Sequence, residues 1–577
     1  MIITLKNIFS LLTKKDKFNF FVLCVFILLN TLLELISLGL IIPAISIIFN
    51  PEMVPEYFLQ IEIISKYLID KNYFIYTLFF ILFVYYLKNI LITLIHIFQT
   101  NYLFSLQKRL SENIFLKFLK NKITFHIKNS KAKLIQIIIG EVNNFVGRVV
   151  SPIIILITEF LIFFGILLIV FLNEFNITYL IFFSFLIFLT YYLFFKNKIS
   201  KWGEDRKIGE SNRIKSVEQS LSFVKEIKLF NKINFFFDDY VKENLKSIFA
   251  SKKLTYIQII PRVLTELLIV TFLILFLIFN LEINTSSQKI ISSLAIFAAA
   301  SFRIMPSINR IMMAIQNLRF GIPIIFPVKS SYDKKINYYN NLPKTRDDKF
   351  IFKQIEFSNV SFSYNKKQTI FKKLNFKIKS KEFIGIVGSS GSGKTTLLNL
   401  IIGFFQPNSG NIYKNKKKFN LKKIRQWHKI IGYIPQRVYL IDDTLINNIK
   451  LNRSKNVNLK KLKKSLKGSE LEKEIIKKKV FLNKKIGENG SLLSEGQRQR
   501  LAIARALYHD RQILILDEAT SSLDKENEKK IFQTISKLKK DKTIIMVTHN
   551  TNNLKMFDRV ISVKDKKIYI KNNKQII

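Results

Sequence analysis

The sequence predicts two unlike parts: an α-helical membrane domain with six spans, followed by a soluble α/β domain of the phosphate-loop type. Up to about Ser307 the chain repeatedly shows apolar runs of membrane-spanning length, whereas beyond Tyr332 it is polar, Lys-rich and alternating. The second part contains GSSGSGKTT, residues 388–396, between a short apolar run and a helical pattern. A mean hydropathy of +0.18 and 13% aromatic residues agree with a large membrane part.

The charge of the chain does not indicate a nucleic-acid partner. Its formal net charge is +50, and clustered Lys and Arg would neutralise phosphates. Lys is, however, accompanied throughout by Ile, Asn and Phe, which indicates a compositional bias, and membrane proteins concentrate basic residues in cytoplasmic loops. Cys24 is the only cysteine in the sequence, so we expect neither an intrachain disulfide nor a cysteine-based metal cluster.

Six apolar stretches are each long enough to cross roughly 30 Å of hydrocarbon. Residues 1–17, ahead of the first of them, have apolar side chains at helical spacing and are expected to lie along the membrane surface. An even number of spans returns the chain to its starting side. The predicted spans are residues 18–49, 73–98, 145–172, 177–195, 257–281 and 290–315.

The charges of the connections predict the orientation of these spans. Lys14, Lys15 and Lys17 flank the first span, and the connections at 99–144 and 196–256 are long and strongly basic. The positive-inside rule therefore places both termini and the two long connections in the cytoplasm. Acidic residues lie in the connection expected on the other side, at Glu52, Glu56, Glu62 and Asp70.

The two long connections are mostly helical in pattern and contain little Gly and no Pro punctuation. The spans are therefore expected to continue well beyond the bilayer. We place the turning points near residues 121–131 and 223–231, where they would meet the soluble domain.

The cations that fall within or beside the apolar stretches include Lys88, Arg262 and Arg303. An unpaired cation there is costly and usually faces a cavity or a partner. The alternative for each is a structural role. Arg262 could pair along its helix with Glu266, and Lys88 could extend its amine to the membrane interface. Acids within the spans could also neutralise Lys88 or Arg262. Those acids are Glu34 and Glu159.

The stretch at 388–396 fits a phosphate-binding loop. Residues 382–387 predict a buried strand before it, and residues 396–402 predict a helix after it. Glycines let the backbone N–H groups curl around phosphates, Lys394 reaches the terminal phosphates, and the Thr395 hydroxyl can bind Mg²⁺. The helix N-terminus adds partial positive charge. The loop residues are Gly388, Ser389, Ser390, Gly391, Ser392, Gly393, Lys394, Thr395 and Thr396.

The domain boundaries follow from these patterns. Residues 320–349 contain Pro323, Pro327 and Pro343, which are typical of a linker. We therefore predict a transmembrane domain over residues 1–319, a linker over 320–351 and a nucleotide-binding domain over 352–577.

Further residues of the soluble part fit nucleotide chemistry. The alternation at 355–364 predicts a strand, and Tyr364 at its end could stack on an adenine ring. The apolar run at 513–516 ends in Asp517, which fits a Mg²⁺ ligand, and Glu518, which fits the base that polarises an attacking water. Residues 494–497 could offer donors to phosphate at a helix N-terminus. After the strand predicted at 543–547, His549 is placed to contact the terminal phosphate.

Taken together, residues 352–577 resemble an ATP-binding cassette (ABC) domain, with every expected motif present in order. The loop GSSGSGKT is followed by GYIPQ with Gln436, the signature LSEGQ from 493, ILILDE, SSLD with Asp524, and His549. The resemblance implies ATP and Mg²⁺ as cofactors, with Gln436 at the metal. It also implies that Ser494, Gly496 and Gln497 of one subunit complete the phosphate loop of another.

With one cassette and six spans, the resemblance implies a homodimer with two ATP sites, and the fusion order is like that of the family's exporters. The roles of two acidic residues in and near the signature are not fixed by the resemblance. Glu495 stands where the family usually has glycine, so its side chain is expected to point away from phosphate. Glu488 matches a position where exporters have an acid facing the coupling loops, or it is a solvated loop residue.

The membrane part also resembles the bacterial flippase for polyprenyl-pyrophosphate-linked oligosaccharide, which serves protein glycosylation. The likeness rests on PRVLTE at 261–266, SFRIMPSINRI at 301–311 and the acidic amphipathic stretch 55–69. It implies a multi-pass protein of the bacterial inner membrane with a cytoplasmic nucleotide-binding domain. Lys88, Arg262 and Arg303 would attract the pyrophosphate in an outward cavity, Lys88 standing where that family has arginine.

Two alternatives remain open from the sequence. A general lipid or drug exporter of the same architecture would make the cations of the spans incidental. A non-transporting regulatory or channel-like cassette protein would typically have degraded catalytic residues, whereas Glu518 and His549 are intact.

Overall fold

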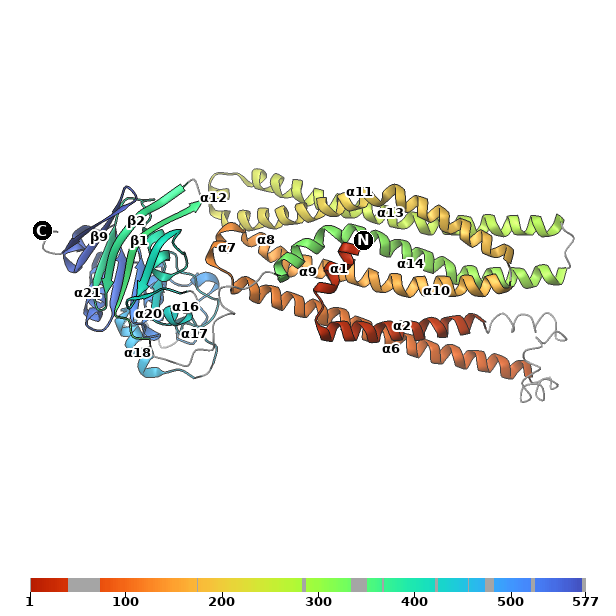
Figure 1. The fold of residues 1–577 in the computed structure, drawn as a ribbon, viewed down its shortest axis with the longest axis horizontal. Coiled ribbons are helices and arrows are strands. Elements are labelled where there is room, and N and C mark those ends of the chain that lie inside the picture. The colour runs from red at the N-terminus through yellow and green to blue at the C-terminus, as the bar shows by residue number, and fades with distance from the viewer. Residues whose placement is uncertain are drawn as a thin grey trace. The chain divides into compact units, whose positions relative to one another are not determined.

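A computed structural model describes residues 2–39, 73–173, 175–282, 287–333, 350–365, 368–420, 424–454, 456–472, 482–519, 525–549 and 551–572 (Figure 1). The chain divides into two compact units: Met1–Leu119 with Asn129–Lys335, and Lys120–Lys128 with Ile336–Ile577. The amphipathic stretch 55–69, most of the predicted linker, and Asp524 lie outside the described residues.

The first unit is built from long helices: α10, α11, α13 and α14 pack against one another, and α6 lies along α2 (Figure 1). The short helix expected at the start of the chain is α1, which ends before the first span begins in α2. The helices are α1 (Ile2–Ser10), α2 (Lys14–Gly39), α6 (Tyr73–Leu119), α7 (Ile123–Lys128), α8 (Lys131–Ile135), a π-helical segment (Gln136–Glu141), α9 (Val142–Phe145), a second π-helical segment (Val146–Val150), α10 (Ser151–Asn173), α11 (Phe175–Ser222), α12 (Val224–Leu229), α13 (Ile233–Glu282) and α14 (Ser287–Asp333).

Among the described residues, five helices are long and apolar enough to cross a membrane. They overlap the first, second, third, fifth and sixth predicted spans, the first of which extends beyond the described residues. The fourth predicted span, residues 177–195, lies in α11, a helix of 48 residues whose first side chains are outside the described part. The helical membrane part is confirmed, and the count of six spans stays a prediction.

Side chains of α11 bind carbonyl groups that prolines free in two neighbouring helices. A proline inside a helix has no N–H for the carbonyl four residues before it. The Tyr191 hydroxyl donates at 2.9 Å to the carbonyl four residues before Pro261 in α13. The Lys207 amine donates at 3.4 Å to the carbonyl of Pro323, four residues before Pro327 in α14. These bonds satisfy carbonyls that the prolines leave without a partner in their own helix.

Helix α14 continues to Asp333 and contains both Pro323 and Pro327. The first part of the predicted linker over 320–351 is therefore helical, and these two prolines do not mark a chain break. The division into three domains at the stated boundaries stays a prediction.

Short helices occur at both predicted turning points of the cytoplasmic connections. Helix α7 joins α6 to the α8–α10 stretch, and α12 joins α11 to α13. Residues 120–128, which include α7, belong to the second unit, where Ile123 packs against a buried core. The first turning point therefore meets the soluble domain as predicted.

The second unit contains two sheets in its described residues. The antiparallel sheet has the strand order β2-β1-β4-β5, and the larger sheet has the order β10-β9-β3-β8-β7-β6, in which β9 to β6 are parallel. The strands are β1 (Gln354–Asn365), β2 (Gln368–Lys379), β3 (Phe383–Val387), β4 (Ser409–Lys414), β5 (Lys417–Lys418), β6 (Ile431–Ile434), β7 (Ile513–Asp517), β8 (Thr543–Val547), β9 (Arg559–Lys564) and β10 (Lys567–Asn572).

Helices cover the sheets of the second unit, and several carry functional residues at their N-termini. They are α15 (Lys394–Ile402), α16 (Ile424–Lys429), α17 (Leu445–Lys450), α18 (Leu459–Gly468), α20 (Glu495–Tyr508) and α21 (Lys525–Lys537), with 3₁₀ turns at Glu488–Gly490, Leu538–Lys540 and Thr551–Met556. The strands predicted at 355–364, 382–387 and 543–547 are confirmed as β1, β3 and β8, and the helix predicted at 396–402 is confirmed as α15.

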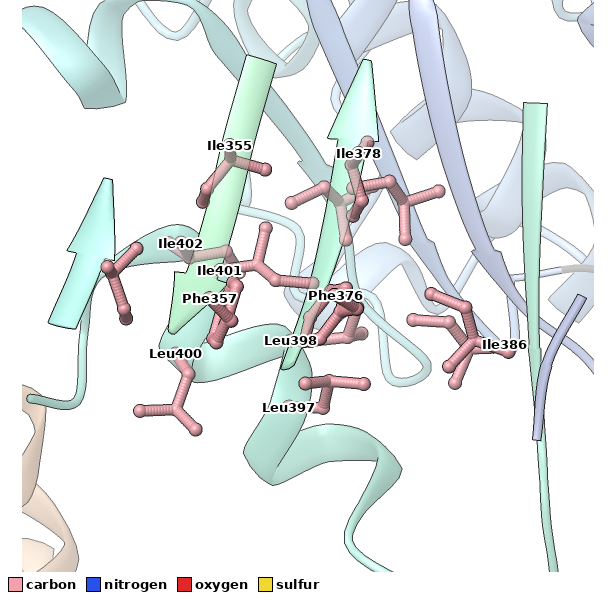
Figure 2. Close-up of a cluster of buried hydrophobic side chains, with 14 of the residues drawn as sticks. Ile355, Phe357, Phe376, Ile378, Ile386, Leu397, Leu398, Leu400, Ile401 and Ile402 are labelled. Carbon is pink, nitrogen blue, oxygen red and sulfur yellow. The ribbon is translucent and has the colours of Figure 1, made fainter. Parts of the chain in front are cut away.

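The core between the sheets holds α15 in place. Figure 2 shows side chains of α15, such as Leu397 and Ile401, pointing toward Phe357 of β1 and Phe376 of β2. The two rings stack at a centroid distance of 4.3 Å. Because β3 and α15 are both buried here, the loop between them is fixed at each end.

Candidate nucleotide site and membrane cavity

Four neighbouring parallel strands end at one edge of the larger sheet, in the order β3-β8-β7-β6. The phosphate loop follows β3, His549 follows β8, Asp517 ends β7 with Glu518 directly after it, and Gln436 follows β6. Ligands of parallel α/β sheets bind outside the carboxyl ends of the strands. The sheet thus brings to one edge motifs that are far apart in the sequence.

Glycines give the phosphate loop its backbone shape. Gly391 and Gly393 have φ of +76° and +108°, a region that disfavours side chains. A Cβ on Gly388 would lie 2.6 Å from the carbonyl oxygen of Val563. The Lys394 amine donates to the carbonyls of Gly388 and Ser389, each at 3.0 Å, so the loop closes around its own lysine.

The residues of the loop fit a phosphate group. A Cβ on Gly391 would meet no atom within 4 Å, which leaves open space beside the loop. The Ser392 hydroxyl is buried and has no hydrogen-bond partner among the described residues. Thr395 is exposed in the first turn of α15, and α15 directs its N-terminus to the loop. These groups would hold the phosphates of ATP, whose Mg²⁺ would find Thr395 and Asp517 at the same edge.

Asp517 is held by a tyrosine that the sequence analysis did not single out. The Tyr433 hydroxyl, on β6, donates to Asp517 Oδ2 at 3.1 Å. Burial raises the pKa of Asp517 above its ordinary value, while the Tyr433 hydrogen bond opposes this rise. Burial, together with the charge of Asp517 and the hydrogen bond to it, raises the pKa of Tyr433. Tyr433 lies in GYIPQ, so its position just ahead of Gln436 was the available signal.

Glu518 binds two side chains at once. Gln436 Nε2 donates to Oε2 at 2.6 Å, and His549 Nε2 lies 2.6 Å from Oε1. The backbone of Glu518 has φ of 51°, in the left-handed region that non-glycine residues rarely adopt and that recurs at active sites. The structure thus brings together the three residues to which the sequence assigns catalysis: Glu518 as the base, His549 for the terminal phosphate and Gln436 at the metal.

Tyr364 lies at the end of β1 beside the phosphate loop. Its hydroxyl is 2.8 Å from the Thr396 hydroxyl, and its ring packs edge-on against Phe362 and Phe405. Tyr364 is 44% exposed, so its ring can still stack on a base.

The signature residues form the start of α20. The Ser494 hydroxyl caps the helix by accepting from the backbone N–H of Gln497, whose side chain accepts from the N–H of Ser494. Glu495 pairs with Arg498 at 2.5 Å, so its carboxylate has a cation of its own. Gly496 lies in the first turn between them.

Glu488 is exposed in a 3₁₀ turn, which is compatible with both of its predicted roles.

In the membrane unit, two of the three predicted cations share one carboxylate. Glu34 on α2 lies 2.8 Å from Arg303 on α14 and 3.5 Å from Lys88 on α6. The Lys88 amine also donates to the Ser37 hydroxyl at 3.0 Å. Arg262 on α13 is exposed and is not part of this cluster.

A cavity of about 470 Å³ lies next to this cluster. It also contains a second ion pair, in which Arg310 lies 2.6 Å from Glu159, while Ser307 donates to the other oxygen of Glu159 at 2.6 Å. Arg310 lies within the predicted span 290–315 but was not singled out there, because its partner Glu159 is 151 residues away in the sequence. The lining residues are Ile27, Asn30, Glu34, Ile92, Ile95, His96, Gln99, Ile155, Thr158, Glu159, Ile162, Arg303 and Arg310.

The fold and the site define a phosphate-loop ATPase joined to a helical membrane domain. A family model described as "ABC transporter" matches residues 371–521. A protein of Wigglesworthia glossinidia brevipalpis named "ATP-dependent lipid A-core flippase" is 30% identical over 491 residues, 79% of this chain and 78% of that protein. The chain therefore belongs to the ABC transporter family, in its exporter type, as an ATPase-coupled transporter whose cofactors are ATP and Mg²⁺.

Two further comparisons support the same assignment. A protein of the same name from Pectobacterium atrosepticum is 36% identical over 221 residues, which is 38% of each chain. A solved structure entitled "Structure of a bacterial Atm1-family ABC exporter with ATP bound" matches with a TM-score of 0.78 and 18% identity, over 97% of this chain and 95% of that one. At this identity the match shows a shared fold.

Proposed function

We propose that this ABC exporter is a flippase that uses ATP hydrolysis to move a phosphate-bearing glycolipid, in the first place a polyprenyl-pyrophosphate-linked oligosaccharide. The proposal rests chiefly on the cavity with Arg303 and Arg310 on its wall. Cations at this depth in a membrane protein are costly, and they are usually retained for an anionic ligand or a partner. A phosphorylated lipid headgroup meets that description, because arginine binds phosphate oxygens through two parallel hydrogen bonds.

Residues of the nucleotide site have defined roles in this proposal. Glu518 polarises the attacking water, and His549 contacts the terminal phosphate. Gln436, which binds Glu518 in this structure, would be one of the residues that hold Mg²⁺. Lys394 and the loop N–H groups bind the phosphates, and Tyr364 stacks on the base. Thr395, Asp517 and Gln436 would hold Mg²⁺, which would neutralise charge on the phosphates, and the partner's signature residues with Asp524 would close the site.

We infer a homodimer, supported by the second turning point. Exposed apolar side chains surround α12, and such a patch on a soluble surface commonly marks a contact. Leu229 is 82% exposed and Phe230 70%. The cassette of a second copy is the partner we assign to this surface. With the basic connections cytoplasmic, the protein is a multi-pass protein of the bacterial inner membrane, and its nucleotide-binding domain lies in the cytoplasm.

A flipping assay in vesicles tests the substrate. The purified chain is reconstituted with a fluorescent polyprenyl-pyrophosphate-linked oligosaccharide, and its ATP-dependent movement between leaflets is measured. Glu518→Gln serves as the control without hydrolysis. We expect movement with the wild-type chain alone. If lipid A-core moves and the polyprenyl substrate does not, the specific substrate is wrong and the wider class of phosphorylated glycolipid stands.

A second observation favours a general lipid or drug exporter. A cavity of about 160 Å³ in the same unit is lined almost wholly by apolar and aromatic side chains from α10, α11 and α14, including Phe163, Phe188 and Met312. Such a site suits an uncharged amphiphile. Transport of a neutral amphiphile that is unaffected by Arg303→Gln would favour this function over the first.

A further inference from the structure

The cations and carboxylates of the membrane cavity are not equally reachable. The Arg303 side chain is 21% exposed, whereas its partner Glu34 is 8% exposed. Arg310 and Glu159 show the same order, with 43% and 7%. In both pairs, therefore, the arginine is the more exposed partner, and all four side chains line the cavity.

The two ion pairs differ in net charge. Glu34 is shared by Arg303 and Lys88, so two cations face one carboxylate. Arg310 and Glu159 balance each other, and Ser307 satisfies the remaining oxygen of Glu159. Arg303 and Arg310 are seven residues apart on one face of α14, about 10 Å along the axis. The excess positive charge is therefore confined to the Arg303 end.

Unused hydrogen-bonding groups lie at that same end. Arg303 Nε and Asn30 Oδ1 are buried and have no hydrogen-bond partner among the described residues. Arg303 holds Glu34 through Nη2 only. A guanidinium can present Nε and one Nη together as a fork to two phosphate oxygens. A phosphate that takes this fork must replace the Glu34 carboxylate at Nη2.

We propose that Glu34 is an exchangeable internal counter-ion, which neutralises Arg303 and Lys88 while the cavity is empty and is displaced by the anionic headgroup of the lipid. This inference rests on the proposed function. Without Glu34, two cations would remain unpaired in the membrane. With it, each binding event must break an ion pair, so the affinity for the anion is lowered. A transported ligand must leave as well as enter, and this competition favours release.

The experiment measures ATPase stimulation of the full chain in nanodiscs by undecaprenyl pyrophosphate and by undecaprenol, its uncharged counterpart. Glu34→Gln keeps the shape of the side chain and removes its charge. We expect the concentration of undecaprenyl pyrophosphate for half-maximal stimulation to fall about tenfold, a ~1.4 kcal/mol change, with no change for undecaprenol. An unchanged or higher concentration for undecaprenyl pyrophosphate overturns the proposal.

Two further variants keep the test decisive. Glu210→Gln removes a carboxylate that pairs with Arg213 at 2.6 Å outside the cavity, and it is expected to change neither response. Glu34→Asp serves if Glu34→Gln does not fold. It keeps the charge but shortens the side chain, which weakens the contact with Arg303, so it should lower the half-maximal concentration of undecaprenyl pyrophosphate by a smaller factor. If the wild type responds equally to both lipids, the proposed function fails. If the wild type prefers the pyrophosphate and neither Glu34 variant lowers its half-maximal concentration, the counter-ion role of Glu34 is wrong and the proposed function stands.

Discussion

Glu34 in the membrane unit and Glu518 at the nucleotide site each bind two side chains from other elements. Glu34 holds two cations, Lys88 and Arg303. Glu518 holds Gln436 and His549, partners that need carry no charge. The two carboxylates therefore have different roles. The carboxylate of Glu34 offsets charge that would otherwise be buried, whereas that of Glu518 is kept in place for chemistry.

The largest expected effect is on catalysis at Glu518. Glu518→Gln keeps its hydrogen-bonding shape but removes the base, so steady ATP turnover should fall by at least about 10²-fold while nucleotide binding is retained. Turnover and binding of a fluorescent ATP analogue measure the two properties. Glu526→Gln, an exposed acid paired with Lys530, is the matched control. Unchanged turnover in Glu518→Gln would remove this residue from the role of base.

For stability the order of the two carboxylates should be the opposite: a change at Glu34 should lower the free energy of unfolding more than a change at Glu518. Glu34→Leu leaves Lys88 and Arg303 without their anion, and breaking a buried ion pair costs about 3–5 kcal/mol. Glu518→Gln replaces one acceptor among neutral partners and should change the free energy of unfolding by less than about 1 kcal/mol. Denaturant unfolding of both variants in the same detergent compares them. Equal losses would contradict the distinction between the two sites.

A pH profile sharpens the account of the carboxylate beside Glu518. The Tyr433 hydroxyl opposes the rise that burial causes in the pKa of Asp517. In Tyr433→Phe this pKa should rise further. Mg²⁺ needs the ionised carboxylate, so the loss of ATPase activity on acidification should begin at a higher pH than in the wild type.

ATPase rates at limiting Mg²⁺, followed across the acid range, measure the shift. Tyr439→Phe, an exposed tyrosine of the same domain, is the control. A profile identical to that of the wild type would show that the Tyr433 bond does not tune Asp517.

The smallest effect is expected at Glu495, a third carboxylate, which binds one cation at the surface. Its pair with Arg498 is 2.5 Å long and its side chain is 52% exposed. Exposed pairs contribute about 0–1 kcal/mol. Glu495→Gly, which restores the residue usual in the family, should therefore change ATP turnover by less than about twofold. A large change would mean that the carboxylate reaches the nucleotide of a partner subunit.

The sequence by itself determined the class of protein and most of the nucleotide site. Each motif of that site is a short contiguous run, and the run alone predicts a strand that ends in a loop. Parallel strands then bring Lys394, Glu518 and His549 to one edge whatever the connecting residues are. Only Tyr433 was missed there, because its role depends on the register of β6 against β7.

Only the tertiary structure decided the membrane cavity. The sequence showed Lys88, Arg262 and Arg303 as equal candidates and showed acids that could neutralise them. Packing of α2, α6 and α14 placed Lys88 and Arg303 on Glu34 and left Arg262 outside that cluster. Nearly uniform apolar surfaces give helices little local information about which faces meet. Lys88 and Arg303 are 54 and 269 residues away from Glu34 in the sequence. They become its partners only through the packing of the helices.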